Sequence, residues 1–286
     1  MTRIEHRSVR VNGVDLHVAE AGPADGPLVV LLHGFPEFWF EWREQIGPLA
    51  EAGFRVVAPD QRGYNLSGKP KGAREYRLDL LAADVIALAE SYGRRRFSLV
   101  GHDWGASVAW WTATIHPERL ERLIVLNAPH PAVWRKSMTD DPAQRKKSRY
   151  VQLIRLPWLV ETVVRSGNFR GLAAAFDSAT RREAFGPEIL AQYRAAWGQP
   201  GALTGALNWY RALFMQDLPV PAAHSIPTPT LVIWGDQDAF AGPELAEASA
   251  ALCADARVIH FADASHWVVH DKPDAVRDAV LGFLKP

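Results

Sequence analysis

Asp103 is the residue whose type and setting point most directly to chemistry. It lies in Gly101-His102-Asp103-Trp104-Gly105-Ala106, directly after an apolar run and before a helix-like stretch. Small residues two positions before and after a nucleophile are typical of a sharp strand-to-helix turn, where larger side chains would collide with backbone. The helix N-terminus also favours negative charge. We therefore predict that Asp103 is a nucleophile, with a simple helix cap as the alternative role, and that His102 is structural.

A carboxylate at this position restricts the reaction. Attack on an acyl carbon would give a reactive anhydride, whereas attack on a saturated carbon gives an ordinary ester that water can cleave. Esterases and lipases place serine at this position, so Asp103 argues against an esterase. We expect displacement at a saturated carbon, followed by hydrolysis of the ester.

The partners of this nucleophile are expected late in the chain, because such turns precede their acid and histidine in sequence. Asp236 and Asp238 follow one apolar run, and His266 follows the next. We predict that His266 activates a water molecule and that an aspartate orients and stabilises its imidazole. Asp238 is preferred because it has more reach toward His266, whereas Asp236 suits a turn. His270 is expected to be a packing or surface histidine.

Backbone N–H groups near Asp103 can stabilise the negative charge that develops as the ester is hydrolysed. His33-Gly34-Phe35-Pro36 follows the first parallel strand, where this arrangement places one donor. We therefore predict an oxyanion hole formed by the N–H groups of Phe35 and Trp104; an ordinary Gly-Pro turn is the alternative. Phe35, Trp39 and Trp104 are also expected to line an apolar substrate pocket.

Short apolar runs rich in β-branched residues alternate with helix-like stretches, which predicts βαβ units on a parallel sheet. Two earlier alternating segments, Arg7–Val11 and Asp15–Ala19, predict an antiparallel hairpin at the sheet edge. The apolar runs are Leu28–Leu32, Arg55–Ala58, Phe97–Val100, Leu123–Leu126, Thr230–Trp234 and Arg257–His260.

The strand pattern stops after Pro131 and resumes at Thr230. We predict an α/β core formed by residues 1–130 and 224–286, and an inserted helical cap formed by residues 131–223. Within the cap, the candidate helices are 158–164, 171–176 and 188–197.

The composition of the 286 residues is that of one compact globular protein, with 48% hydrophobic and 22% charged residues. Thirty-two basic and thirty-two acidic residues leave no net charge, so nothing predicts binding to nucleic acid or to a membrane. The single cysteine, Cys253, cannot form an internal disulfide, and residues 1–13 lack the apolar core of a secretion signal. No apolar run is long enough to span a bilayer. We expect a cytoplasmic protein that acts on a small, neutral substrate.

Four segments taken together resemble the epoxide hydrolases of the α/β-hydrolase fold, over nearly the whole chain. The resemblance implies a mostly parallel central sheet flanked by helices, an inserted helical cap, an epoxide and water as reactants, and no metal or organic cofactor. Each segment alone is shared with related dehalogenases. The segments are His33-Gly34-Phe35-Pro36-Glu37, Asp60-Gln61-Arg62-Gly63-Tyr64, Gly101-His102-Asp103-Trp104-Gly105-Ala106, and His266-Trp267 with Asp271-Lys272-Pro273.

In that family two cap tyrosines donate hydrogen bonds to the epoxide oxygen. The segment Leu207–Arg211, which contains Tyr210, is similar to the second tyrosine motif, and Tyr150, ahead of Leu156-Pro157-Trp158, falls where the first belongs. The resemblance therefore implies that both phenols act as acids, because the alkoxide released by ring opening needs a donor. The alternative is that both tyrosines only pack in the cap core.

Two positions depart from the family pattern. Asn65 stands where glycine is more frequent, which we interpret as a loop detail, and Ile154-Arg155 replaces a common Phe-Gln pair, which leaves the substrate range open. The closest alternative is a haloalkane dehalogenase, in which Trp104 would bind the leaving halide. Such enzymes usually carry Asn or Gln where this chain has Phe35, and fluoroacetate-type members carry Arg where it has Trp104. A non-catalytic ligand receptor on the same scaffold would be expected to lose parts of the catalytic set, all of which is present here.

Overall fold

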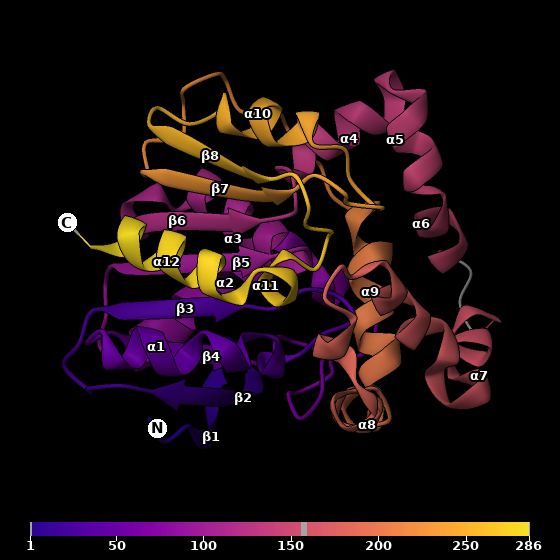
Figure 1. The fold of residues 1–286 in the computed structure, drawn as a ribbon, viewed down its shortest axis with the longest axis horizontal. Coiled ribbons are helices and arrows are strands. Elements are labelled where there is room, and N and C mark those ends of the chain that lie inside the picture. Colours follow the sequence, from indigo (N-terminus) through magenta and orange to yellow (C-terminus); the bar gives the residue numbers. More distant parts are fainter. Residues whose placement is uncertain (1, 156–158, 286) are drawn as a thin grey trace.

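The computed structural model describes residues 2–155 and 159–285 and is built around one central β-sheet (Figure 1). Its eight strands within the described residues have the order β1-β2-β4-β3-β5-β6-β7-β8. Strands β3 to β8 are parallel, while the pairs β1–β2 and β2–β4 are antiparallel. The strands are β1 Glu5–Val11, β2 Val14–Ala21, β3 Leu28–Leu32, β4 Arg55–Pro59, β5 Phe97–His102, β6 Leu120–Leu126, β7 Thr230–Gly235 and β8 Ala256–Phe261.

The strand predictions are confirmed. All six apolar runs lie in β3 to β8, and the predicted hairpin forms β1 and β2 at the sheet edge. The strands β3, β5 and β7 are buried at every position. They read as continuous apolar runs because helices cover both faces of a parallel sheet.

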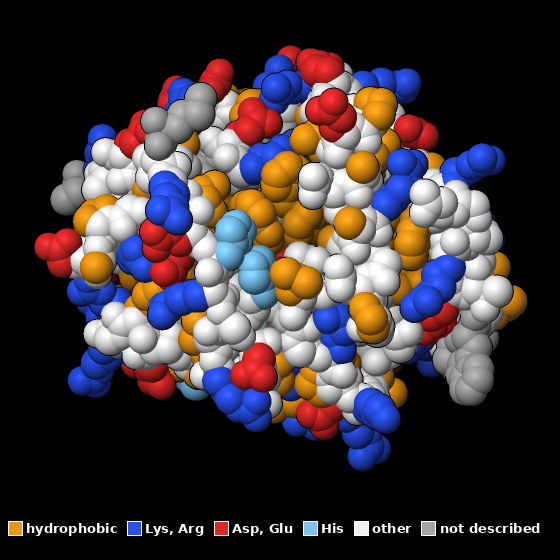
Figure 2. Space-filling view, turned by 90° about the horizontal axis from the view of Figure 1, so that it is seen from below, with side chains coloured by type: hydrophobic (Ala, Val, Ile, Leu, Met, Phe, Trp, Pro, Cys, Tyr) orange, Lys and Arg blue, Asp and Glu red, His pale blue; other side chains and the backbone are white. Residues whose placement is uncertain are grey.

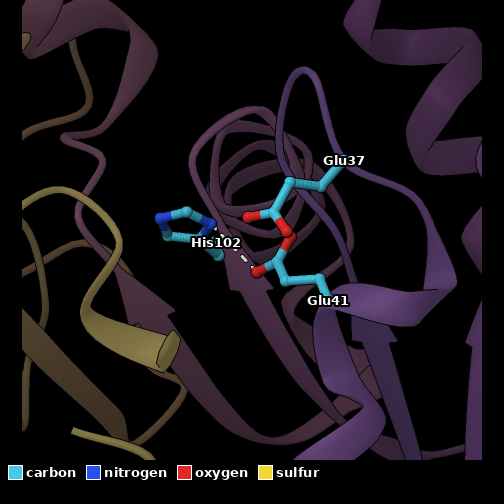
Figure 3. A group of neighbouring side chains, drawn as sticks. All are labelled: Glu37, Glu41 and His102. Carbon is cyan, nitrogen blue, oxygen red and sulfur yellow. Dashed lines mark ion pairs between the residues drawn. The ribbon is translucent and has the colours of Figure 1, made fainter. Parts of the chain in front are cut away.

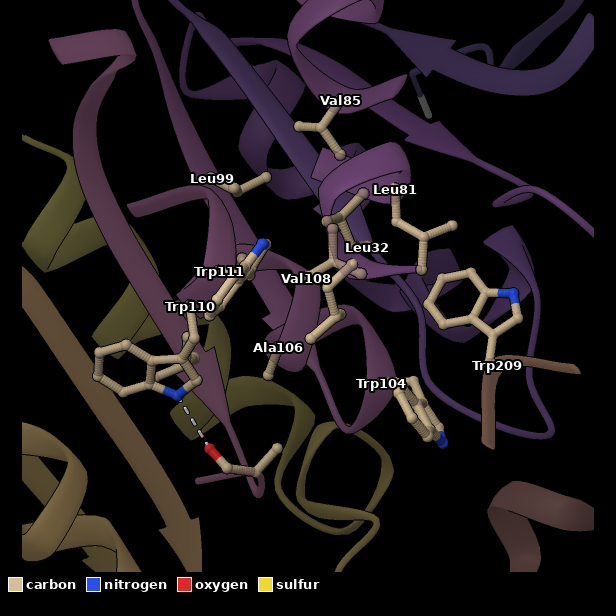
Figure 4. Packing of buried hydrophobic residues seen from close by; sticks show 14 of the residues in the cluster. Leu32, Leu81, Val85, Leu99, Trp104, Ala106, Val108, Trp110, Trp111 and Trp209 are labelled. Carbon is tan, nitrogen blue, oxygen red and sulfur yellow. Dashed lines mark hydrogen bonds between the residues drawn. The ribbon is translucent and has the colours of Figure 1, made fainter. Parts of the chain in front are cut away.

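Two hydrophobic clusters lie on opposite faces of the sheet. In β3, Val29 and Leu31 pack with α1 and α12, whereas Val30 and Leu32 pack with α2 and α3, because successive strand residues point to opposite faces. Figure 4 shows Val108 of α3 packed among residues of the cluster that contains Val30 and Leu32. The helical segments of this part of the chain are η1 Trp39–Glu44, α1 Ile46–Glu51, η2 Ala73–Tyr76, α2 Leu78–Ser91, α3 Trp104–Ile115, η3 Pro117–Arg119, α10 Glu244–Ala250, α11 Val268–Asp271 and α12 Pro273–Leu284.

Between β6 and β7 the regular elements of the described chain are all helical, and they lie at the carboxyl ends of the parallel strands (Figure 1). Ligands of open α/β sheets bind at this edge, so the inserted helices close over the region where a site is expected. The segments are α4 Pro131–Asp140, α5 Pro142–Lys147, α6 Arg149–Ile154, α7 Leu159–Ala173, η4 Ala174–Ser178, η5 Arg182–Phe185, α8 Pro187–Trp197 and α9 Ala202–Leu213.

Two of the three candidate cap helices differ in detail from the structure. The helix predicted at 158–164 continues as α7 to Ala173, with a break of non-helical backbone at residues 166–169. The segment predicted at 171–176 is divided between the end of α7 and the 3₁₀-helix η4. The segment Leu156-Pro157-Trp158, which helps to identify Tyr150 in the family resemblance, lies outside the described residues. Across the described ranges, every helix is too short or too polar to cross a bilayer.

Candidate active site

Asp103 lies on the turn between β5 and α3, where the sequence predicts the nucleophile. Its backbone is strained, with φ at 49° and ψ at −119°. A β-carbon on Gly101 would lie 2.4 Å from the carbonyl oxygen of Gly105, and one on Gly105 would lie 2.2 Å from that of Leu32. Both glycines are therefore needed for the turn to pack this closely against its own helix and β3.

The predicted oxyanion donors lie next to Asp103. The backbone N–H of Phe35 donates to Oδ1 of Asp103 at 2.8 Å. Gly34 makes room for this contact, because a β-carbon there would lie 2.6 Å from Cβ of Asp103. The N–H of Trp104 is the first of helix α3, so it has no carbonyl partner within that helix.

His266 lies between two carboxylates. Its Nε2 is 3.4 Å from Oδ2 of Asp103, and its Nδ1 is 2.7 Å from Oδ2 of Asp238. The Asp238 side chain is fully buried, while that of Asp103 is 19% exposed. The structure thus brings Asp103, His266 and Asp238 together, whereas Asp236 pairs with His260 away from this group.

The two carboxylates control the protonation of His266. Burial opposes the imidazolium, but Asp238 and Asp103 outweigh it and raise the pKa of His266 to about 10. Burial likewise opposes ionisation of Asp103, but His266, His102 and the Phe35 N–H hold the pKa of Asp103 below its ordinary value. At neutral pH the site therefore contains an ionised Asp103 beside an imidazolium.

Asp238 is held by donors that the sequence reasoning missed. The side-chain N–H of Asn127 donates to Oδ2 at 2.8 Å, and the backbone N–H groups of Phe240 and Ala241 donate to Oδ1 at 2.6 and 3.0 Å. Burial raises the pKa of a carboxyl group, but His266 and these donors keep the pKa of Asp238 below its ordinary value. The available signal was Asn127 itself, a polar residue directly after the buried strand β6.

Tyr150 and Tyr210 face the same space as Asp103. Their ring centroids are 6.1 Å apart, and the Tyr210 ring lies 5.2 Å from that of Phe35 and 4.8 Å from that of Trp104. Burial, with a smaller effect from neighbouring negative charge that includes Asp103, raises the pKa of both phenols. Both tyrosines are therefore protonated hydrogen-bond donors at neutral pH.

Helix α9, which carries Tyr210, is fixed against the loop that follows β4. The indole N–H of Trp209 donates to the carbonyl oxygen of Arg62 at 2.9 Å. The backbones also approach closely, since a β-carbon on Gly205 would lie 2.5 Å from the carbonyl oxygen of Gly63. The segment from Asp60 to Tyr64, one of the four that carry the family resemblance, therefore helps to position a cap tyrosine.

Asp103 borders two cavities of unequal size. The larger, of about 500 Å³, is walled mainly by Leu, Ile and Val side chains of α6 and α7 and also by Phe35. The smaller, of about 70 Å³, is walled in part by Trp104. The residues common to both are Asp103, Tyr150, Tyr210, Phe240 and His266. Four of the predicted site residues therefore stand where the cavities meet. Phe240, which the sequence reasoning missed, stands there too, and its ring lies 4.9 Å from that of His266.

The prediction that Trp39 lines the substrate pocket is wrong. The Trp39 ring lies 4.8 Å from that of His6, and its backbone N–H donates to Asp60 at 3.0 Å. It lines a separate, open groove with His6 and His17, and Figure 2 shows histidine and hydrophobic side chains around a hollow in the face seen from below. The physical reason is the direction of η1, which buries Glu41 and so turns Trp39 toward the β1–β2 hairpin.

A buried cluster of Glu37, Glu41 and His102 lies beside the Asp103 turn (Figure 3). The three side chains have ligand atoms within 4.8 Å of one another, a spacing that can hold a metal ion. Each of the three side chains already has a close polar partner, however. His102 Nδ1 is 2.9 Å from Oε1 of Glu41, the other Glu41 oxygen accepts the Gly34 N–H, and Glu37 lies 2.8 Å from Nε2 of His270. We therefore interpret the cluster as a network of buried ion pairs.

This network reaches His266 through the backbone of that residue. The Nε2 of His102 lies 2.8 Å from the carbonyl oxygen of His266. Burial opposes protonation of His102, but the Glu41 carboxylate raises its pKa above the ordinary value. His102 is thus positioned to hold the His266 backbone, and His270 is a fully buried partner of Glu37 and not a surface residue.

The comparison with known proteins agrees with this architecture. Residues 27–273 match the family described as alpha/beta hydrolase fold. The chain is 44% identical to the AB hydrolase superfamily protein YfhM of Bacillus subtilis (strain 168), over 100% of this chain and 99% of that protein. It is 38% identical to Epoxide hydrolase 4 of Homo sapiens, over 98% of this chain and 79% of that protein. Among solved structures it is similar to a variant of an epoxide hydrolase from Bacillus megaterium complexed with its product, a naphthyloxy-propane-1,2-diol, with a TM-score of 0.89, 32% identity, and coverage of 97% of this chain and 99% of that one.

Proposed function

Because this chain belongs to the α/β-hydrolase fold family, and within it to the epoxide hydrolases, we propose that it converts an epoxide to a vicinal diol through a covalent ester on Asp103. One observation carries this proposal. An ionised carboxylate with a histidine on one oxygen and two protonated phenols line the same apolar cavity. A nucleophile for carbon and donors for the departing oxygen are therefore available to one bound epoxide.

In the first step, a carboxylate oxygen of Asp103 attacks an epoxide carbon and the bond from that carbon to the ring oxygen breaks. Tyr150 and Tyr210 donate hydrogen bonds to that oxygen as its negative charge develops. The raised pKa of both phenols keeps them protonated for this task. One phenol gives its proton to the alkoxide, and the proton that His266 loses replaces it. The product is a hydroxyalkyl ester on the enzyme.

In the second step, water attacks the carbonyl carbon of the ester while His266 accepts a proton from it. Ester formation removes the charge of Asp103, one of the two carboxylates that raise the pKa of His266. The first step therefore converts His266 toward the neutral base that the second step needs. The N–H of Phe35, already on Oδ1 of Asp103, and the N–H of Trp104 stabilise the tetrahedral intermediate. Loss of the diol restores the carboxylate and the imidazolium.

The substrate class follows from the walls of the site. The larger cavity offers mainly Leu, Ile and Val side chains, which favour an epoxide with a bulky apolar or aromatic substituent. The related Bacillus megaterium enzyme, with its naphthyloxy product, supports an aryl substituent here.

The experiment offers the purified protein aryl and alkyl epoxides and bromoalkanes, and follows diol and bromide release against an Asp103→Asn control. We expect diol without bromide, and no product from the control. Replacing both Tyr150 and Tyr210 with Phe should abolish diol formation, because the alkoxide then lacks its donors. Bromide release without diol would assign the site to a haloalkane dehalogenase, and undiminished diol formation by the double variant would refute the role of the phenols.

A further inference from the structure

Positive charge is concentrated in one stretch of the inserted helices. Residues 145–170 contain seven Lys and Arg residues and a single acid, Glu161, although the whole chain has no net charge. Glu161 pairs with Arg211. The exposed cations are Arg145, Lys146, Arg149, Arg155, Arg165 and Arg170, and among the described residues none of them forms an ion pair with a carboxylate.

The same stretch exposes large apolar side chains. Leu153, Leu159 and Val163 are 64%, 61% and 61% exposed. All three also line the larger cavity. A side chain that lines a cavity and is also more than half exposed lies at its entrance, so the entrance has an apolar rim. Phe214, which is 41% exposed, adjoins this rim, because the Arg155 guanidinium lies 4.5 Å over its ring.

We infer that this face of α6 and α7 docks on a lipid surface with anionic headgroups, and that apolar epoxides enter the cavity from the lipid. A polar face rich in Lys and Arg beside an apolar rim is the pattern of segments that lie in a membrane interface. In Figure 1 both helices are at the outer edge of the molecule, away from the sheet.

The cations and the apolar rim together favour a lipid surface as the binding partner. The cations alone would suit any polyanion, and the apolar rim alone would suit a protein surface, but a lipid surface satisfies both. It also dissolves the apolar substrates for which the cavity is built. The zero net charge of the chain, which predicts no membrane partner, does not reveal this local asymmetry because charge elsewhere cancels it.

The test measures sedimentation of the full-length protein with vesicles of phosphatidylcholine alone and of phosphatidylcholine mixed with phosphatidylglycerol. We expect binding to the mixed vesicles, weakened by added salt because exposed charges are screened. The double variant Arg165→Gln/Arg170→Gln should bind these vesicles about twenty-five-fold more weakly, since each cation near an anionic surface contributes about fivefold. Leu159→Ser should also weaken binding, because it removes part of the rim.

The matched control is Arg3→Gln/Arg10→Gln, which removes two exposed cations from the N-terminal part of the chain and should leave vesicle binding unchanged. Thermal unfolding midpoints show whether each variant is folded. Absence of binding to the mixed vesicles, or equal binding to both kinds, would overturn the inference. An equal loss of vesicle binding in the control variant would also overturn it. So would binding of the protein to DNA that Leu159→Ser leaves unchanged, because the cations would then serve a polyanion without the apolar rim.

Vesicle binding requires no catalysis, so docking on lipid is tested separately from the proposed function. Only the delivery of epoxide from the lipid rests on the proposed function. With an apolar epoxide dissolved in the mixed vesicles, the double cation variant should lose turnover more than it does with a water-soluble epoxide. Equal turnover losses for the two substrates would refute delivery from the lipid.

Discussion

Replacing Gly205 with alanine is expected to slow ester formation without touching Asp103, His266 or Asp238. The added β-carbon would lie 2.5 Å from the carbonyl oxygen of Gly63, so α9 must shift by about 0.5 to 0.9 Å to reach the 3.0 to 3.4 Å of a tight contact. Tyr210 moves with this helix. Because a misplacement near 1 Å can cost about a hundredfold in rate, we expect the rate of ester formation to fall about ten- to a hundredfold.

The effect of Gly205→Ala on stability combines two opposing contributions. Overpacking costs about 1 to 3 kcal/mol, while alanine gains about 1 kcal/mol over glycine inside a helix. The matched control is Gly282→Ala in α12, where an added β-carbon meets nothing within 4 Å. It should be stabilised by up to about 1 kcal/mol and keep full activity.

The assay is single-turnover ester formation followed by mass spectrometry of quenched samples, together with thermal unfolding of both variants. If Gly205→Ala formed the ester as fast as Gly282→Ala and were equally stable, the close approach of α9 to Gly63 would not position Tyr210. The account of how the cap is held would then be refuted.

Three further outcomes are expected. Asn127→Ala should lower the free energy of unfolding by about 2 to 4 kcal/mol, because the buried Asn127 amide holds Asp238 and bonds both backbone groups of Gly235. The variant should also slow ester hydrolysis more than ester formation. Chemical denaturation measures the first effect, and build-up of the covalent adduct measures the second. The raised pKa of His266, about 10, means that its ion pairs stabilise the fold fully below about pH 6.5 and that this contribution is lost as the pH rises through 10. The unfolding midpoint of the wild type should therefore fall more steeply over this window than that of His266→Gln, and parallel curves would contradict the assigned pKa shift. Trp39→Ala should leave kcat/KM unchanged, since Trp39 lines a separate groove; a large loss would return it to the substrate pocket.

The sequence predicts the sheet and the positions of the main site residues because both depend on local signals. Continuous apolar runs mark buried parallel strands, and the glycines around Asp103 mark a turn whose packing tolerates no side chain. Parallel strands end at the same edge of the sheet, so polar residues at their ends come together there. Asp238 could be chosen over Asp236 because it lies further from the strand end and has more reach toward His266, and the structure has it 2.7 Å from His266.

Other features depend on packing directions that a sequence does not contain. The prediction for Trp39 is wrong because the direction of this side chain is set by the 3₁₀-helix η1. The burial of Glu41 in η1 turns the Trp39 indole outward. Phe240 and the contact of Gly205 with Gly63 depend on the approach of segments far apart in the chain. The basic stretch at 145–170 is visible in the sequence, but its meaning depends on the exposed rim of the cavity.

The covalent ester on Asp103 is the central claim, and intact-protein mass spectrometry of His266→Gln tests it most directly. With an epoxide that the wild type hydrolyses, this variant should gain the mass of one epoxide and keep it, and peptide mapping should place the added mass on Asp103. The double variant Asp103→Asn/His266→Gln should gain none. An unmodified His266→Gln protein, or an adduct on another residue, would contradict the two-step mechanism.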